Sequence, residues 1–410
     1  MGAGHSHGAH RAHRTDEPEF QVGRRPRTIL LALLALAALV TVVGVTSLWP
    51  DSSQVDRITN KVSFAARGVT FPVAVVDSVR PPCPDSAHQD KTCNTIVVTV
   101  QEGAGKGDKT SVQVSPQVSG SGLKHGDKVK LQRTPGRQGA DAAYGYFGTV
   151  RTTPLLLLTL VFAALVVLIA RWRGFFALLG LAFSGIVIWH FMLPALLTGA
   201  PGLAVGLCGS ALIMFVVLYT THGFSLRTSA ALAGTLAGVL VTAALGVSAA
   251  AAARATGVSD ESGSVLQSLV GQLSFPGLFA CAAVVAGLGV LNDVTITQAS
   301  SVWEIRSAAP RMGRAEVFAS SMRIGRDHIA STIYTIVFAY AGTALAVLLI
   351  LQLYGLPAAE LLTTEEITEE IIRTLASSIG LVLAVPLTTA IATLVVPRAA
   401  PHGSEEHQHH

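Results

Sequence analysis

The chain has 410 residues, of which half are hydrophobic and only 13% are charged. A soluble protein carries about 25% charged residues, and several apolar runs here reach about 20 residues, the length of a membrane-spanning helix. The composition therefore excludes an ordinary soluble protein and predicts a mainly α, polytopic membrane protein in contact with the lipid bilayer. The net charge of +4 is small, and the arginines stand at the ends of apolar runs, which favours membrane orientation over nucleic-acid binding.

Both ends of the chain, residues 1–27 and 399–410, are polar and are predicted to be disordered cytoplasmic tails. They are rich in histidine, which can bind zinc, nickel or copper in short tracts. The histidines are His5, His7, His10, His13, His402, His407, His409 and His410. No cysteine or carboxylate cluster at metal-ligand spacing accompanies them, so solvated tails are the favoured interpretation, and no metal or cofactor is expected.

The first apolar run, Ile29–Leu48, is predicted to be a membrane helix within residues 28–49. Arg24, Arg25 and Arg27 precede it, as basic residues precede the apolar part of a signal peptide. The run is longer than that of a signal peptide, however, and no small-residue cleavage site follows. We therefore expect an uncleaved helix whose basic start is cytoplasmic.

Residues 50–150 differ in kind, because short β-branched runs alternate with turn clusters. The five predicted strands are Phe71–Val79, Thr95–Gln101, Ser111–Val114, Lys128–Gln132 and Tyr144–Val150. This spacing predicts a small extracytoplasmic β-barrel of the OB or SH3 type. Cys83 and Cys93 flank the connection between the first two strands and are predicted to form a disulfide. Cys208 and Cys281, inside apolar runs, are predicted to be ordinary buried thiols.

Residues 151–398 are predicted to form a bundle of seven further membrane helices, which gives about eight spans in all. The predicted spans are 154–171, 175–197, 202–221, 228–252, 275–297, 329–353 and 374–397. The pairs Gly202/Gly206 and Gly234/Gly238 have the spacing that permits close helix approach. The distribution of arginines among the loops places both termini in the cytoplasm, and we expect a multi-pass protein of the cytoplasmic (inner) membrane.

Polar residues interrupt one apolar run of this bundle and open the next. The interrupting residues, several of them on one helical face, are Asn292, Asp293, Thr297, Gln298, Ser300 and Glu304. The next helix is predicted to start near Arg326, Asp327 and His328. Ionisable groups at membrane depth cost about 2.5–3.5 kcal/mol each and usually face a bundle interior or a wet cavity. We expect Asp293 in the inner leaflet and the two polar faces to meet near the cytoplasmic mouth.

Three interpretations of these residues stay open. In the first, Asp293 is a cation or proton site, Asp327 and His328 are its titrating partners, and Arg326 is a gate or counter-ion. In the second, an ion pair of Asp293 or Glu304 with Arg326 fixes two helix ends. In the third, the 304–328 segment docks a cytoplasmic partner, and residues 310–324 form a short amphipathic helix on the inner surface.

The leading functional hypothesis is a transporter or permease of a small solute or ion. The alternative is a membrane scaffold or sensor whose outer β domain binds an envelope component and signals through the 304–328 loop. No nucleophile–base arrangement, metalloprotease motif or nucleotide-binding fingerprint has convincing spacing, so no catalytic residues are assigned and an enzyme is not expected.

Two blocks of the sequence resemble the signature blocks of the YibE/F-like family of membrane proteins. They are Gly287–Ile305 (GLGVLNDVTITQASSVWEI) and Ser320–Gly342 (SSMRIGRDHIASTIYTIVFAYAG). The layout of one N-terminal helix, an extracytoplasmic domain and about seven further helices is similar too. The resemblance implies a topology like that of transport proteins and assigns no catalytic or ligand residues. The positions that match the motif are Asn292, Asp293, Gln298, Glu304, Gly325, Arg326, Asp327 and His328.

Overall fold

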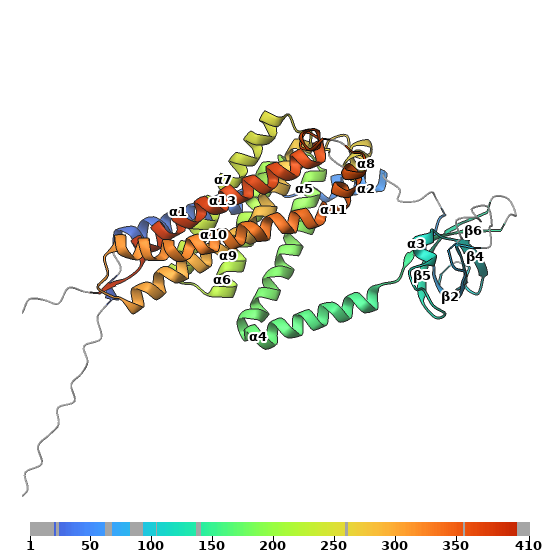
Figure 1. The fold of residues 1–410 in the computed structure, drawn as a ribbon, viewed down its shortest axis with the longest axis horizontal. Coiled ribbons are helices and arrows are strands. Elements are labelled where there is room, and N and C mark those ends of the chain that lie inside the picture. Colours follow the sequence, from blue (N-terminus) through green and yellow to red (C-terminus); the bar gives the residue numbers. More distant parts are fainter. Residues whose placement is uncertain are drawn as a thin grey trace, which may run out of the picture. The chain divides into compact units, whose positions relative to one another are not determined.

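A computed structural model describes residues 20–21, 24–61, 68–82, 93–103, 105–136, 141–258, 261–355 and 357–399. The chain divides into two compact units (Figure 1). One unit is residues 57–171, and the other combines residues 1–56 with residues 172–410. We refer to them as the barrel unit and the bundle unit and describe each by itself.

The barrel unit contains one curled antiparallel sheet, as the sequence predicts. Its strands are β2 (Val73–Val79), β3 (Thr95–Val100), β4 (Lys109–Gln113), β5 (Lys128–Thr134) and β6 (Ala143–Thr149). They pair in the order β4-β3-β2-β5-β6, and the edge strands β4 and β6 also contact each other. A one-turn helix, α3 (Pro116–Ser119), lies between β4 and β5 in the chain. This order is typical of the OB alternative among the two predicted barrel types.

Alternating side chains of the strands fill the inside of this sheet, because successive residues of a strand point to opposite faces. The buried residues are Ala74, Val76, Ile96, Val98, Val100, Val112, Val129 and Leu131. Cys93, at the start of β3, is disulfide-bonded. Its predicted partner Cys83 lies outside the described residues, so the pairing stays a prediction. Cys208 and Cys281 are free thiols, and Cys281 is buried.

Apolar helices make up the bundle unit, and the first part of α4, up to Arg171, belongs to the barrel unit. These helices are α1 (Arg24–Ser47), α4 (Thr152–Val187), η1 (Ile188–Met192), α5 (Leu193–Leu197), α6 (Gly202–His222), α7 (Leu226–Ala253), α9 (Phe275–Ala308), α10 (Arg314–Thr343), α11 (Leu345–Leu353) and α13 (Glu365–Val395). Shorter helices are α2 (Ser52–Lys61), α8 (Glu261–Leu269) and α12 (Ala358–Leu361). Six helical stretches in the described chain are long and apolar enough to cross a membrane, or up to seven if the bent pair α10–α11 is one span.

The difference from the predicted eight spans arises between residues 152 and 197. Two spans are predicted there, 154–171 and 175–197, but the structure has one helical stretch of 46 residues, Thr152–Leu197. Neither proline nor a run of polar residues separates the two predicted spans. Arg171 nevertheless has non-helical backbone angles, φ 54° and ψ −134°, and stands where the barrel unit ends. A kink at this arginine therefore divides the stretch.

The polar central segment is more helical than predicted. The predicted start of a helix near Arg326 is wrong, because α10 begins at Arg314, and residues 314–324 form its first turns instead of a separate surface helix. Glu316 provides the start signal, since its Oε2 accepts a hydrogen bond from the Gly313 amide at 2.8 Å. In the α9–α10 turn, the buried Arg306 Nη1 donates to the carbonyls of Pro310 and Met312 at 3.1 and 2.6 Å.

The two ends of the bundle unit's chain lie together. Residues Phe20–Gln21 form the short strand β1, which pairs antiparallel with β7, Arg398–Ala399. The segment 1–27 is therefore not irregular throughout, since β1 and the first turn of α1 lie within it. The start of α1 and the end of α13 are consequently at the same end of the bundle unit.

Helices α7, α9 and α13 pack closely against one another at glycines. A Cβ atom on Gly234 of α7 would overlap Thr388 of α13, and one on Gly238 would lie 2.7 Å from Leu291 of α9. The other predicted pair behaves alike, because a Cβ on Gly202 would overlap Gly277. Close approach at both glycine pairs is thus confirmed, as expected where small residues let helices meet.

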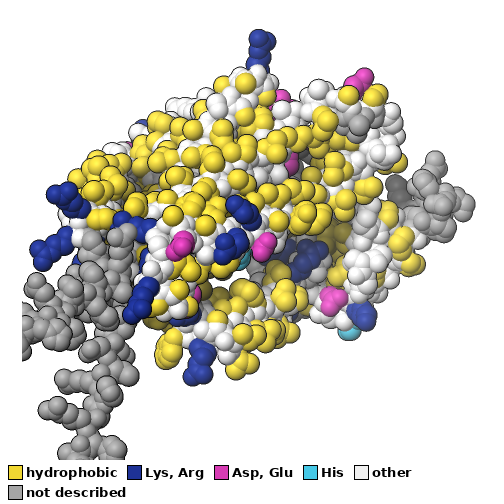
Figure 2. All heavy atoms as spheres, turned by 60° about the vertical axis from the view of Figure 1, so that its left-hand side comes forward, with side chains coloured by type: hydrophobic (Ala, Val, Ile, Leu, Met, Phe, Trp, Pro, Cys, Tyr) yellow, Lys and Arg dark blue, Asp and Glu magenta, His cyan; other side chains and the backbone are white. Residues whose placement is uncertain are grey.

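The outer surface of the bundle unit is largely hydrophobic, as Figure 2 shows. Leu181 of α4, Trp189 of η1, Leu240 of α7 and Phe338 of α10 all expose more than half of their surface. Such exposure is costly in water and favourable in hydrocarbon, so it fits a multi-pass membrane protein.

Gly234→Ala should destabilise the protein, because the new methyl group overlaps the Thr388 side chain in a close-packed contact. Overpacking of this kind typically costs about 1–3 kcal/mol. The measurement is the thermal unfolding midpoint in detergent, followed by the reaction of the buried Cys281 with a thiol dye. The control is Gly289→Ala in α9, which has no neighbour within 4 Å of the new atom. An equal midpoint for the two variants would contradict the packing argument.

Candidate functional site

Charged groups mark both ends of the apolar part of α13. At one end, Arg373 Nη1 pairs with Glu370 Oε2 at 2.9 Å. At the other end, Arg314 Nη2 of α10 donates to the Leu394 carbonyl at 3.1 Å. From Arg373 to Leu394 the helix rises about 31 Å at 1.5 Å per residue. This length matches the hydrocarbon thickness of a bilayer, about 30 Å.

Asp293 of α9 lies near the middle of this span. Arg373 stacks over the ring of Phe279, and Gln298 hydrogen-bonds Thr389, so α9 and α13 run side by side in the same direction. Asp293 precedes Gln298 by five residues and is therefore level with residue 384, about 16 Å from Arg373. This level is a position within the bundle unit, and the inner-leaflet position of Asp293 stays a prediction.

Asp327 of α10 lies at nearly the same height. Thr389 of α13 contacts Met322 of α10, and a Cβ on Gly325 would lie 2.7 Å from Val385. These contacts show that α10 runs antiparallel to α13, which places Asp327 within about one turn of residue 384. Two carboxylates on neighbouring helices therefore share one level of the bundle unit, near the middle of the apolar part of α13.

A buried polar cluster lies one to two helical turns from these carboxylates, toward the C-terminal end of α9. Gln298 is 1% exposed, and its Nε2 donates to the Ser321 carbonyl, to Ser321 Oγ and to Thr389 Oγ1 at 2.9, 3.0 and 2.8 Å. Ser301 Oγ lies 2.5 Å from Ser321 Oγ. We call Gln298, Ser301, Ser321 and Thr389 the amide–hydroxyl cluster. It joins α9, α10 and α13 at a depth where water cannot satisfy polar groups.

A proline of α13 and a glycine of α10 lie beside the amide–hydroxyl cluster. Pro386 lies inside α13 and has no N–H, so the helix loses one backbone hydrogen bond there. A Cβ on Gly325 would lie 2.9 Å from Gln298 Oε1 and 2.7 Å from Val385, the residue before this proline. Proline within a helix and glycine at a helix contact are features of helices that bind or move at membrane sites.

The polar stripe predicted on α9 lies opposite to its packed face. Asp293 and Glu304 are exposed, and Thr297 and Ser300 between them are half-buried. The packed face carries a second series with nearly the same helical spacing, namely Leu291, Val294, Thr295, Gln298 and Val302. Of the predicted residues, the structure therefore brings Gln298 into the core and leaves the stripe at the surface of the bundle unit.

Arg326 and Asp327 of α10 are exposed as well, whereas His328 is half-buried. Among the described residues, no ion pair within 4.0 Å joins Arg326 to Asp293 or Glu304, so the predicted Asp–Arg pairing of helix ends is not formed. Asn292, half-buried next to Asp293, has a buried Oδ1 without a hydrogen-bond partner. The predicted residues thus form a half-open polar region instead of a closed network.

Sequence reasoning missed the hydroxyl partners of Gln298. Ser301, Ser321 and Thr389 are common residue types in membrane helices, and their single hydroxyls often bond their own backbone. A second missed contact is Thr235 Oγ1 of α7 to Thr295 Oγ1 of α9, at 2.6 Å. The usable signal is the position of Gln298 and Thr295 in the apolar series of α9, which predicts burial of both.

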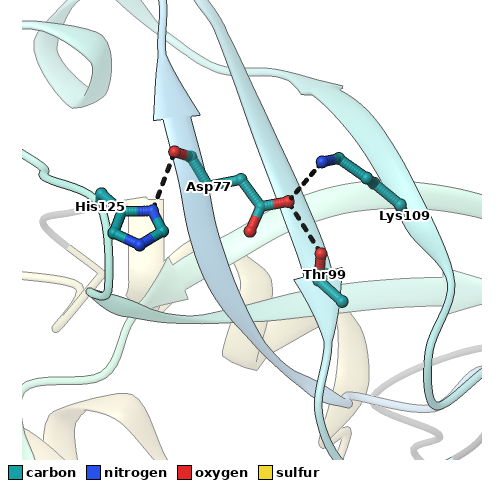
Figure 3. Close-up of polar contacts among 4 residues, drawn as sticks. All are labelled: Asp77, Thr99, Lys109 and His125. Carbon is teal, nitrogen blue, oxygen red and sulfur yellow. Dashed lines mark hydrogen bonds and ion pairs between the residues drawn. The ribbon is translucent and has the colours of Figure 1, made fainter.

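The barrel unit carries a separate charged contact on its sheet (Figure 3). Asp77 Oδ2 of β2 accepts a hydrogen bond from Thr99 Oγ1 at 2.8 Å and pairs with Lys109 Nζ at 3.3 Å. His125 Nδ1 lies 3.1 Å from the Asp77 carbonyl. The Thr99 hydrogen bond, with Lys109, lowers the pKa of Asp77 below its ordinary value, against a smaller opposing effect of burial.

The comparisons with known proteins identify one family. The family described as YibE/F-like protein matches residues 158–398, which include both polar helices α9 and α10. No curated protein and no solved structure matches the chain. Within the described part of the chain, no group of three or more histidine, cysteine, aspartate or glutamate side chains is placed to hold a metal ion.

Gln298→Leu should lower stability, because the two N–H donors of Nε2, shared among three acceptors, are lost while the side-chain volume is kept. At about 0.6 kcal/mol per interhelical bond, the expected loss is about 1 kcal/mol. The thermal midpoint in detergent measures it. Thr297→Val, one residue earlier on the outward face, is the matched control and should stay within about 0.5 kcal/mol of the parent protein. Equal midpoints would show that the amide–hydroxyl cluster contributes no stability.

The barrel should lose stability in acid through Asp77. A carboxylate whose pKa is lowered by folding stabilises the fold above its ordinary pKa, and this stabilisation disappears as pH falls through the lowered value. Peptic cleavage inside residues 68–150, mapped by mass spectrometry between about pH 5 and pH 2, follows the opening of the barrel. Asp77→Asn should weaken this pH dependence, whereas Asn at the exposed Asp141 should not. A parallel response of both variants would contradict the assignment.

Proposed function

Because the chain belongs to the YibE/F-like family, whose match covers the polar helices, we propose that it is a membrane transporter of a small solute or ion. The observation that supports this most is the height of Asp293 and Asp327. Both carboxylates are level with the middle of the apolar part of α13, one to two turns from the buried Gln298 and close to the level of Pro386. Substrate and ion sites of transporters lie at this depth, next to interrupted helices.

We also propose eight membrane spans. In the bundle unit, Trp49 after α1 stacks on Phe191 of η1, the element that follows the second half of α4. Arg173, at the start of that half, interacts electrostatically with His222 at the opposite end of α6. The chain therefore leaves at one end of the bundle unit and re-enters at the other. The apolar stretch Thr152–Ala170 supplies the crossing between them.

Eight spans agree with the position of the chain ends. An even number of crossings returns the chain to its starting side, and β1 pairs with β7. The excess of arginine at that side, including Arg306, Arg311 and Arg314, supports a cytoplasmic location for both termini. The barrel unit is then extracytoplasmic, and the protein belongs in the cytoplasmic membrane.

In the proposed mechanism, Asp293 holds the transported or coupling cation or proton. Asp327 lies at the same height and His328 follows it, so both can exchange a proton with that site. Gln298 is a fixed polar group next to this site, because its hydrogen bonds to Ser321 and Thr389 hold its amide in place. Arg326 is the counter-ion when the site is empty, and bending of α13 at Pro386 changes access.

Asp293→Asn should reduce flux at least about tenfold, because the amide keeps the shape but loses the charge that attracts a cation. The measurement uses purified protein in liposomes with an enclosed pH dye, under imposed Na⁺, K⁺ and pH gradients. Glu366→Gln, an exposed acid at the far end of α13, is the control and should leave flux unchanged. Flux equal to the parent protein in Asp293→Asn and in Asp327→Asn would remove both residues from the mechanism.

A scaffold or sensor is the second candidate, and one observation favours it. The barrel unit is compact and has its own buried core, as binding modules have. In this proposal the barrel binds an envelope component, and the 304–328 segment passes the signal to a cytoplasmic partner. Deleting residues 55–148 separates the proposals: a transporter keeps its flux, whereas a sensor with no flux loses its cellular response.

A further inference from the structure

The charged residues at mid-height lie on the outside of the bundle unit, where hydrocarbon would surround them. Asp293 of α9 and Arg326 and Asp327 of α10 are all exposed. Figure 2 shows acidic and basic side chains next to each other within a largely hydrophobic face. Intramembrane charges almost always face protein or water, so this surface requires a cover.

The remaining membrane segment of this chain does not provide a suitable cover. The apolar stretch Thr152–Ala170 belongs to the barrel unit, and its sequence contains no ionisable side chain. It can exclude lipid, but it cannot neutralise Asp293 or Arg326. The cover must therefore bring charged groups of its own at the same height.

We propose that a second copy of the chain covers this face and completes the polar region. The face carries both signs at one level, since Arg323 and Arg326 stand beside Asp327 on α10 and Asp293 lies on the adjacent α9. In a twofold dimer the same patch meets itself, so opposite charges can pair reciprocally. Arg326 of each copy pairs with Asp293 of the other, and the two carboxylate sites share one interface.

This arrangement explains two features that a single copy leaves unexplained. The stripe of Asp293, Thr297, Ser300 and Glu304 has regular helical spacing, although it faces away from its own core. Arg326 also finds no acidic partner within 4.0 Å in its own described chain. The inference rests on the exposure and height of these groups and not on transport, so it can fail while the proposed function stands.

The test is disulfide formation between two differently tagged copies of the full chain in native membranes. Cys208 and Cys281 are replaced by alanine, while Cys83 and Cys93 are kept. One copy carries Asp293→Cys and the other carries Arg326→Cys. Mild oxidation should give a mixed-tag dimer as the main product. The experiment is repeated with Thr297→Cys in both copies, which keeps Asp293 and Arg326. This variant should also crosslink, even if the loss of the charges in the first pair impairs folding.

The matched control replaces Asp293→Cys by Leu387→Cys. Leu387 is 41% exposed on α13, and its neighbour Thr389 contacts Gln298, so it lies within about one turn of Asp293 in height but on another face. It should give at least about tenfold less mixed-tag dimer. Equal crosslinking of the two pairs would show random collision and overturn the proposal.

A reciprocal charge exchange provides the second measurement. Asp293→Arg and Arg326→Asp should each reduce the Thr297→Cys crosslink, and the double variant should restore it. Absence of any crosslink, with Thr297→Cys open to a membrane-impermeant thiol reagent, would overturn the proposal. The face would then line an aqueous cavity of a single copy.

Discussion

The close approach of α7, α9 and α13 determines where every polar side chain of the bundle unit can lie. Glycines at the contacts remove the side chains that would otherwise hold the helices apart, as Gly234 does opposite Thr388. At this distance a single side chain can reach two neighbouring helices, and Gln298 bonds both α10 and α13. Without glycine at these points, the amide–hydroxyl cluster could not form.

The absence of water in the bilayer explains why this cluster lies inside and is well bonded. A buried amide in hydrocarbon has no alternative partner, so its donors must be satisfied by the protein. Gln298 meets this condition, since the two N–H groups of its Nε2 are shared among three acceptors. Asp293 and Asp327 are exposed and have no such set of protein partners within the described chain. We therefore regard Gln298 and its partners as structural and propose that the two aspartates are functional.

The barrel unit is stabilised in a different way. Its core consists mostly of alternating β-branched residues, and its charged contact of Asp77 with Lys109 is at the surface, where such a pair contributes little at neutral pH. The chain passes from the barrel unit to the bundle unit after Arg171, whose backbone is not helical. Because of the kink at this residue, the apolar helical stretch Thr152–Leu197 is divided between the two units. The length of the stretch alone therefore does not give the number of membrane spans.

The sequence by itself determined the class of protein, the five strands and most membrane helices. Runs of apolar residues and alternating β-branched residues are local patterns, and the bilayer and the barrel core select them directly. It also singled out the polar residues of α9 and α10, since ionisable residues are rare within apolar runs.

Only the tertiary structure decided which face of α9 is packed. Two series of residues there share nearly the same helical spacing, one through Asp293 and one through Gln298, and spacing alone cannot tell which meets a neighbouring helix. The start of α10 at Arg314 was also hidden, because its first turns are polar and gain their stability from contacts such as Ser321 with Gln298. That shift moves Asp327 from the first turn of α10 to its interior, level with the middle of the apolar part of α13, since this level depends on which residues of different helices pack side by side.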